Sequence, residues 1–472
     1  METDAPAATT QVVVTPPVVP PPVVLAPAEP DPAEPTPPPP TAPAEPVGAG
    51  GPPGFEPMAT VPLAEEPPTR RSRGLLVGAV VAAAVAAAVA FLLVNGGDPG
   101  GLSTGATTVP PRTQPSPTPL ATPSEGPACP EGLKLAFFGA LTGDSASLGV
   151  NIKQGAELAI DEWNEENPDC QVGLEGLDSQ GDAAQASALA QHAVEDGSIV
   201  GVIGPAFSGE SLQANPLFEE AGLPVVTPSA TRIDLADQGW TIFHRTIAND
   251  AAQGPRMAKY TVGTGATTVA VIDDASEYGI GLADVVRSTL SDEGGTLSTS
   301  ESIDPAAQDY SATVNKIAGG NPDAVVYCGY YAEAGRFVKQ LRDVGYEGTF
   351  VAGDGVLDPG FVAAAGSDAA EGAVITCPCA PAPDDYGTAY EEAFGQAAGS
   401  YSPEAYDAAN IFLEAINAGN YDRGSINTFI SNIDYQGITK HFKFDERGEL
   451  AVVAIYAYRV EGGEIQPGEI IE

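Results

Sequence analysis

The polar residues best suited to chemistry follow short apolar runs in the chain. Ser208 comes soon after the run 199–204 and opens a segment of helical composition. Its hydroxyl, together with the free N–H groups and the positive dipole end of a helix N-terminus, is suited to bind a carboxylate. Ser229, Ala230 and Thr231 follow a second run and add two hydroxyls at a turn. The simpler alternative is that Ser208 and Thr231 only cap helices.

The second half of the chain has aromatic and acidic residues in equivalent places. Tyr278, Tyr330 and Asp354 each follow an apolar run. A tyrosine offers a ligand both a ring and a hydroxyl, and a carboxylate pairs with an ammonium group. Taken singly, each is also an ordinary loop residue. Taken together, they predict a clamp with anion-binding amides on one side and a carboxylate on the other, which would hold a zwitterion.

No motif for metal, cofactor or enzymatic chemistry accompanies these residues. The chain has three histidines and five cysteines, and only Cys377 and Cys379 are closely spaced, with no histidine near them. The sequence has no GxxxxGK[ST] or HExxH pattern, and Ser208 is outside a GxSxG frame. We therefore expect no metal, no cofactor and no enzymatic activity.

The net charge argues against polyanionic partners, which are nucleic acids and anionic lipid surfaces. There are 63 acidic and 20 basic residues, which give a net charge of −43 at pH 7. Nucleic acids and anionic lipid surfaces are bound by clusters of Lys and Arg, and no such cluster occurs beyond residue 128. We expect the excess acid to form a solvated surface and not a cation site.

The elements that must position the polar residues begin at Leu133. From there, apolar runs of strand length alternate with helical segments, as is typical of parallel sheets covered by helices on both faces. A break at 245–253 separates two series of strands, and helices at 386–432 and a hairpin at 446–448 follow. We predict an α/β protein with two Rossmann-like lobes. In such sheets ligands bind beyond the carboxyl ends of the strands, where the polar residues above lie.

The first 128 residues have a different composition. Residues 1–73 are rich in proline and predict a disordered tail. Residues 74–95 are uncharged and predict a transmembrane helix, and the arginines at 70, 71 and 73 would keep the tail in the cytoplasm. A cleaved signal peptide that starts at Met58 is the alternative. The Gly-, Pro-, Ser- and Thr-rich residues 96–128 predict a linker.

At these stretches the sequence resembles the type I periplasmic solute-binding proteins, specifically the leucine/isoleucine/valine-binding family of ABC importers. The resemblance runs from about Leu133 to the C-terminal hairpin, and its motifs occur in the family's order. They are FFGALTGDSASLG with GAELAIDEWN, VIGPAFSGES, GLPVVTPSAT, FHRTIANDAAQGP, DASEYGIGLA, VVYCGYYAEAGRFVKQLRDVG, VAGDGV and FDERGEL.

The resemblance implies roles for the polar residues. Ser208 and Thr231 correspond to the pair that holds the α-carboxylate of an amino acid, and Ser229 to the residue whose carbonyl accepts from the ammonium group. Asp354 stands at the acidic position that completes the ammonium site, where the family usually has glutamate.

The resemblance also implies a pocket for the ligand's side chain. Tyr278 and Tyr330 match aromatic contacts from the second lobe, and Tyr401 is expected in the same pocket. Leu148 stands where an aromatic residue is frequent, and Phe207 where a disulfide cysteine can occur. These departures keep the ligand class but leave the ligand's identity open.

A two-lobed receptor of this family implies three crossovers between the lobes. We expect them near 245–249, 376–380 and 443–445 of a binding domain that spans 129–472. The first lobe would then comprise about 129–247 and 380–442, and the second about 248–379 and 443–472.

The expected compartment indicates how the cysteines are paired, because thiols outside the membrane tend to form disulfides. Cys129 and Cys170 each precede one of two adjacent strands, so we expect them to form a disulfide. Cys328, Cys377 and Cys379 have no assigned pairing.

These observations predict a single-pass membrane protein with a cytoplasmic N-terminus and an extracellular or periplasmic binding domain. It would bind an amino acid or a similar small polar solute and deliver it to an ABC permease. The alternative is a sensor that reports the ligand to a cytoplasmic partner through the proline-rich tail.

Overall fold

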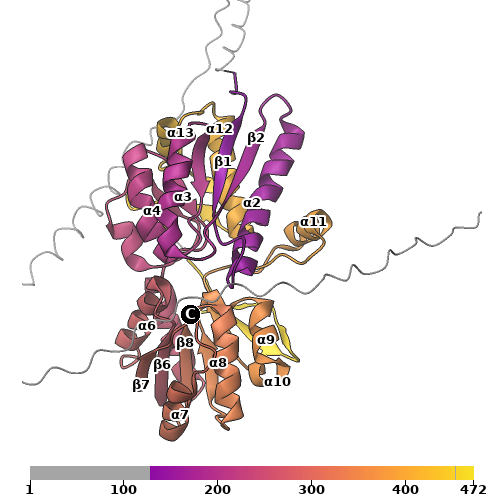
Figure 1. The fold of residues 1–472 in the computed structure, drawn as a ribbon. Coiled ribbons are helices and arrows are strands. Elements are labelled where there is room, and N and C mark those ends of the chain that lie inside the picture. Colours follow the sequence, from indigo (N-terminus) through magenta and orange to yellow (C-terminus); the bar gives the residue numbers. More distant parts are fainter. Residues whose placement is uncertain (1–127, 452) are drawn as a thin grey trace, which may run out of the picture. The chain divides into compact units, whose positions relative to one another are not determined.

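The structure is a computed structural model that describes residues 128–451 and 453–472. The predicted tail at 1–73, the predicted membrane helix at 74–95 and nearly all of the predicted linker at 96–128 lie outside the described residues. Within the described ranges, no helix has both the length and the apolar character needed to cross a membrane. The described chain folds into two lobes, each built on its own sheet (Figure 1).

The first lobe contains five parallel strands, whose order across the sheet is β2-β1-β3-β4-β5. Every residue of β3, β4 and β5 is buried because helices cover both faces of the sheet. The strands are β1 (Leu133–Gly139), β2 (Val172–Asp178), β3 (Ile199–Ile203), β4 (Val225–Thr227) and β5 (Phe243–Arg245).

Two groups of helices cover this sheet (Figure 1). One face packs against α3 (Ala183–Glu195), α4 (Ser208–Ala221) and the short η1 (Ile233–Asp237). The other face packs against α2 (Ala146–Glu166), α12 (Ser402–Asn417) and α13 (Arg423–Ile430). Helix α11 (Asp384–Phe394) packs on α2, and the small hairpin of β11 (Tyr435–Gln436) and β12 (His441–Phe442) follows α13. The chain therefore returns to the first lobe after it has built most of the second.

The second lobe has a mixed sheet in the order β14-β13-β10-β9-β8-β6-β7, with β15 paired to β13. Strands β6 to β10 are parallel, whereas β13 runs antiparallel to β10, β14 and β15. The strands are β6 (Thr268–Asp273), β7 (Thr296–Ser302), β8 (Ala324–Cys328), β9 (Thr349–Ala352), β10 (Val374–Cys377), β13 (Ile455–Glu461), β14 (Glu464–Ile465) and β15 (Glu469–Ile471).

Helices also cover both faces of the second sheet (Figure 1). Helices α5 (Asp250–Gly263) and α6 (Glu277–Thr289) pack on one face. The opposite face carries α7 (Ser311–Gly320), α8 (Tyr331–Asp343), α9 (Pro359–Ala365) and α10 (Ser367–Ala370), and η2 (Asp354–Val356) follows β9. The predicted α/β fold with two lobes built on parallel strands is confirmed.

The chain passes between the lobes three times. The first crossover joins β5 to α5 and the second joins β10 to α11. The third follows Leu450, later than the predicted 443–445, because Phe444 forms a β-bridge with Leu450 and both side chains pack in the core of the first lobe. The sequence could not show this, since an apolar residue at 444 suits either lobe.

Candidate ligand-binding site

A cavity lies between the lobes, at the carboxyl ends of their strands. The first lobe contributes Leu148, Ile152, Ala206, Phe207, Ser208, Ser229 and Tyr401, and the second contributes Tyr278, Tyr330, Asp354 and Gly355. The cavity volume is about 20 Å³, which is room for about one water molecule. An amino acid can therefore enter only when the lobes open, and the wall must adjust around it when they close again.

One end of the cavity is formed by the N-terminus of α4. Ser208, the first residue of α4, is buried, and its Oγ accepts a hydrogen bond from the backbone N–H of Arg232 at 3.3 Å. The N–H groups of a first helical turn have no partners within the helix, so they are suited to bind an anion. Nearby, the Glu210 carboxyl accepts from the Phe207 N–H at 3.2 Å, and burial raises the pKa of Glu210 to about 8. At neutral pH this acid is largely protonated and does not oppose a bound carboxylate.

The loop 229–231 beside this helix is fixed by a buried arginine. Arg245, at the end of β5, is fully buried, and its Nη1 donates to the carbonyls of Ala230 and Arg232 at 2.9 and 3.0 Å. Its Nη2 pairs with the Glu449 carboxylate at 2.6 Å. Arg245 therefore holds the backbone of this loop in place, and its positive charge is neutralised by Glu449.

Of the three predicted residues in this loop, only Ser229 lies on the cavity wall. Its hydroxyl donates to the Ala206 carbonyl at 2.7 Å. Ala230 and Thr231 are buried behind the wall, because the Asp250 N–H donates to the Thr231 carbonyl at 2.9 Å and ties this residue to the first crossover. The structure thus brings Ser208 and Ser229 to the cavity, but not Ala230 or Thr231.

The opposite end of the cavity is formed by Asp354, which follows β9. The Tyr278 hydroxyl donates to Oδ1 at 2.7 Å, and the Tyr401 hydroxyl donates to Oδ2. The Tyr278 hydroxyl also accepts from the Gly355 N–H at 3.1 Å. Burial raises the pKa of Asp354, and the two tyrosine hydroxyls lower it in part. Tyr401 belongs to the first lobe, so its hydrogen bond to Asp354 joins the two lobes.

The remaining wall is apolar. The Phe207 and Tyr330 rings meet edge to face with centroids 5.3 Å apart, and Tyr330 lies at the same distance from Tyr278. Leu148 and Ile152 come from α2 and lie on one helix face because they are four residues apart. Ile152 was not among the residues predicted for the site. This side of the cavity suits an apolar side chain.

A second acid lies close to Asp354. Asp250, the first residue of α5, is fully buried, and neither of its carboxylate oxygens has a hydrogen-bond partner in the described structure. Burial and then the charge of Asp354 raise the pKa of Asp250 to about 7. No feature of the sequence singles out Asp250, because an aspartate at the start of a helix is common.

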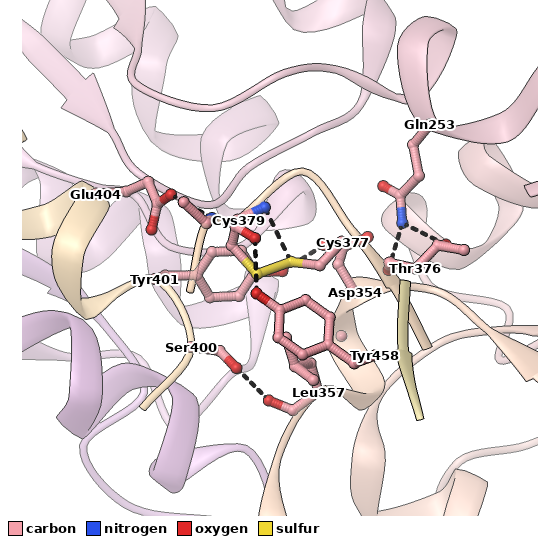
Figure 2. Close-up of a disulfide and its surroundings, with 12 residues drawn as sticks. Gln253, Asp354, Leu357, Thr376, Cys377, Cys379, Ser400, Tyr401, Glu404 and Tyr458 are labelled. Atoms are coloured by element: carbon pink, nitrogen blue, oxygen red, sulfur yellow. Dashed lines mark hydrogen bonds between the residues drawn. A yellow bond between two sulfur atoms is a disulfide. The ribbon is translucent and has the colours of Figure 1, made fainter. Parts of the chain in front are cut away.

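Two disulfides are present among the described residues. Cys129 and Cys170, which were expected to pair, form one with Cα atoms 5.3 Å apart. Cys377 and Cys379 form the other, in the second crossover (Figure 2), and Cys328 is a buried free thiol. Within residues 128–451 and 453–472, no group of three or more His, Cys, Asp or Glu side chains is arranged to hold a metal ion.

Two lobes with a cavity between them, lined by polar groups at opposite ends, define a two-lobed solute-binding protein. A profile of the family described as periplasmic binding protein matches residues 132–464. The chain belongs to this family and is a type I solute-binding protein of the leucine/isoleucine/valine-binding group. The family resemblance seen in the sequence is confirmed.

Similar proteins match most of the described chain. The leucine-, isoleucine-, valine-, threonine- and alanine-binding protein of Pseudomonas aeruginosa is 30% identical over 326 residues, which are 67% of this chain and 87% of that protein. A Leu/Ile/Val-binding protein of Rhizobium johnstonii is 31% identical and covers 71% of this chain and 94% of its own. The substrate-binding protein of a branched-chain amino acid transporter from Streptococcus pneumoniae, in complex with isoleucine, superposes with a TM-score of 0.67 at 26% identity and covers 72% of this chain and 99% of its own.

Proposed function

We propose that this protein is an extracytoplasmic receptor that binds an amino acid, or a similar small zwitterion, and delivers it to an ABC importer. One observation carries the proposal: Asp354 and the N-terminus of α4 at Ser208 lie on walls of the same cavity and come from different lobes. A carboxylate attracts an ammonium group, and a helix N-terminus attracts a carboxylate. A ligand with both charges would therefore draw the two lobes together.

The names of the relatives support this ligand class. The proteins from Pseudomonas aeruginosa and Rhizobium johnstonii are named for the amino acids they bind, and the structure from Streptococcus pneumoniae contains isoleucine. In the proposed complex Ser208 and Thr231 bind the carboxylate and the Ser229 carbonyl and Asp354 bind the ammonium group. Because Thr231 lies behind the cavity wall, its role requires the loop 229–231 to shift when the ligand binds.

The apolar wall supports an apolar ligand side chain. In the proposed complex it packs against Leu148, Phe207 and Tyr330, with Tyr278 closing the side toward Asp354. These side chains already lie in contact with the cavity. Binding at this wall buries apolar surface, which contributes about 25 cal/mol for each Å² removed from water.

We further propose that the uncharged residues 74–95 anchor the receptor in the membrane, with the tail 1–73 in the cytoplasm. The sensor remains the second candidate, because a proline-rich tail can bind a cytoplasmic partner. Deletion of residues 1–69 separates the two. Solute uptake should persist if the receptor serves an importer, and a ligand-dependent cellular response should be lost if it is a sensor.

A thermal-shift screen over amino acids, amides and short carboxylates tests the ligand class. A ligand at 100 times its Kd adds about 2.7 kcal/mol to the free energy of unfolding. Asp354→Asn should then weaken binding of the best amino acid about 30-fold, because it leaves the ammonium group without a charged partner. Asp292→Asn, on an exposed residue, is the matched control. If only ligands without an ammonium group raise the melting temperature, the amino-acid assignment fails.

A further inference from the structure

The second crossover contains a small covalent ring, formed by a disulfide between two cysteines that are one residue apart. Cys377 ends β10, and its disulfide to Cys379 encloses only Pro378. Both cysteines are buried at the point where the chain leaves the second lobe (Figure 2). A ring this small restrains the backbone torsions inside it, which are ψ of Cys377, both torsions of Pro378 and φ of Cys379, and proline fixes its own φ independently. The torsions inside the ring therefore contribute little to the torsional changes of a hinge.

Hydrogen bonds attach this ring to the second lobe. The Tyr458 hydroxyl of β13 donates to the Cys379 carbonyl at 3.0 Å. One residue before the ring, the Thr376 carbonyl accepts from Gln253 Nε2 of α5 at 2.9 Å. The disulfide ring thus moves with the second lobe as far as Cys379.

The next residue is attached to the first lobe. The Ala380 N–H donates to Oε1 of Glu404, a fully buried acid on α12, at 2.9 Å. Lys440 Nζ lies 3.5 Å from the same oxygen, and the Thr246 hydroxyl, in the first crossover, donates to the Glu404 carbonyl at 3.1 Å. The change from one lobe to the other therefore falls between Cys379 and Ala380. Their peptide bond is planar, so rotation there is limited to the Cα–C bond of Cys379 and the N–Cα bond of Ala380. We call this junction the pivot.

The pivot is also connected to the cavity. Glu404 lies three residues after Tyr401 on the first turn of α12, so the two side chains belong to one rigid segment. Tyr401 donates to Asp354 across the cleft (Figure 2). The segment that anchors the pivot therefore also carries a side chain of the candidate site.

We propose that the Cys377–Cys379 disulfide and Glu404 are positioning residues that set ligand affinity by restricting the range of open conformations. This inference rests on the proposed function. Closing a restrained hinge loses less conformational entropy, and fixing the backbone of one residue costs about 1 to 2 kcal/mol. When the restraint is lost, fewer open molecules have a binding-competent geometry and the apparent Kd rises.

The test is ligand binding by full-length Cys377→Ala/Cys379→Ala, with the amino acid that gives the largest thermal shift as the probe. Affinity should fall about tenfold, through slower association and not faster dissociation, because the closed complex is unchanged. Removal of the other disulfide in Cys129→Ala/Cys170→Ala should leave affinity unchanged. Glu404→Ala should also weaken binding, and Glu404→Gln should restore most of it by keeping the acceptor for Ala380.

A second measurement does not depend on the ligand. The distribution of distances between spin labels on the two lobes, measured without ligand, should be broader in Cys377→Ala/Cys379→Ala than in the wild type. The same broadening should follow reduction of the wild-type protein, which covers the case in which the variant does not fold. An unchanged distribution overturns the inference, as does unchanged affinity. If no amino acid binds the wild type but the distribution broadens, the ligand class fails and the positioning role stands.

Discussion

The burial of the Asp250 carboxylate is poorly compensated within the described structure. Its carboxylate is fully buried, has no hydrogen-bond partner among the described residues and lies near the charge of Asp354. The nearby Thr231 hydroxyl, and then the positive charges of Arg245 and Arg232, lower its pKa in part, but the pKa remains at about 7. The protonated form is therefore the more stable one in the folded protein below this pH.

This environment predicts how stability depends on pH. The pKa of Asp250 is about 7 in the folded protein and near 3.8 when unfolded, so between these values the folded state binds more protons. The free energy of unfolding should consequently fall by up to about 1.4 kcal/mol per pH unit from this group as the pH rises from 4 to 7. Asp250→Asn removes this contribution.

Urea unfolding at two pH values checks this prediction. Asp250→Asn should be more stable than the wild type at pH 8, and the difference should shrink at pH 5. The exposed Asp292→Asn should follow the wild type at both values. Equal pH dependence in Asp250→Asn and the wild type would contradict the assigned pKa.

The residues of the site were predictable to the extent that they follow strands. Ser208, Ser229, Tyr330 and Asp354 lie on the cavity wall because each comes soon after the carboxyl end of a strand. The contact of Tyr401 with Asp354 could not be inferred from spacing, since it joins two lobes at a point that only the hinge geometry determines.

At the scale of elements, the close contact between α2 and α12 in the first lobe depends on one glycine. A Cβ atom on Gly155 of α2 would lie 2.1 Å from the Ser402 carbonyl at the start of α12. The alternating pattern of the sequence predicted the strands and α2, but not this approach, because the pairing of α2 with a distant helix leaves no local signal.

This close contact predicts a large loss of stability when a single methyl group is added at Gly155. Gly155→Ala should destabilise the protein by about 2 to 3 kcal/mol, because the clash is with backbone and α12 must shift. Gly387→Ala, inside α11 with open space around the added Cβ, should instead stabilise it by about 0.5 to 1 kcal/mol. Chemical denaturation of the two variants checks the pair, and equal effects would show that α12 is not packed as described.

At the scale of the whole molecule, polar contacts also join the lobes through residues that do not line the cavity. Arg232, before η1 in the first lobe, pairs with Glu277 at the start of α6 in the second. Ser147 of α2 donates to Asp358, the N-cap of α9, at 2.6 Å. These contacts require the lobes to be close together, so they stabilise the closed conformation relative to the open one.

The Arg232–Glu277 pair should therefore contribute to ligand affinity without touching the ligand. The Glu277 side chain is 50% exposed, so the contribution should be below about 1 kcal/mol, or roughly threefold in Kd. Glu277→Gln should weaken binding by this factor at low salt, and the difference should vanish in 1 M NaCl, where exposed charges are screened. Asp343→Asn, which breaks an ion pair within α8 alone, should not change Kd. A salt-independent loss in Glu277→Gln would mean that the residue acts through packing, and not through a charge contact made on closure.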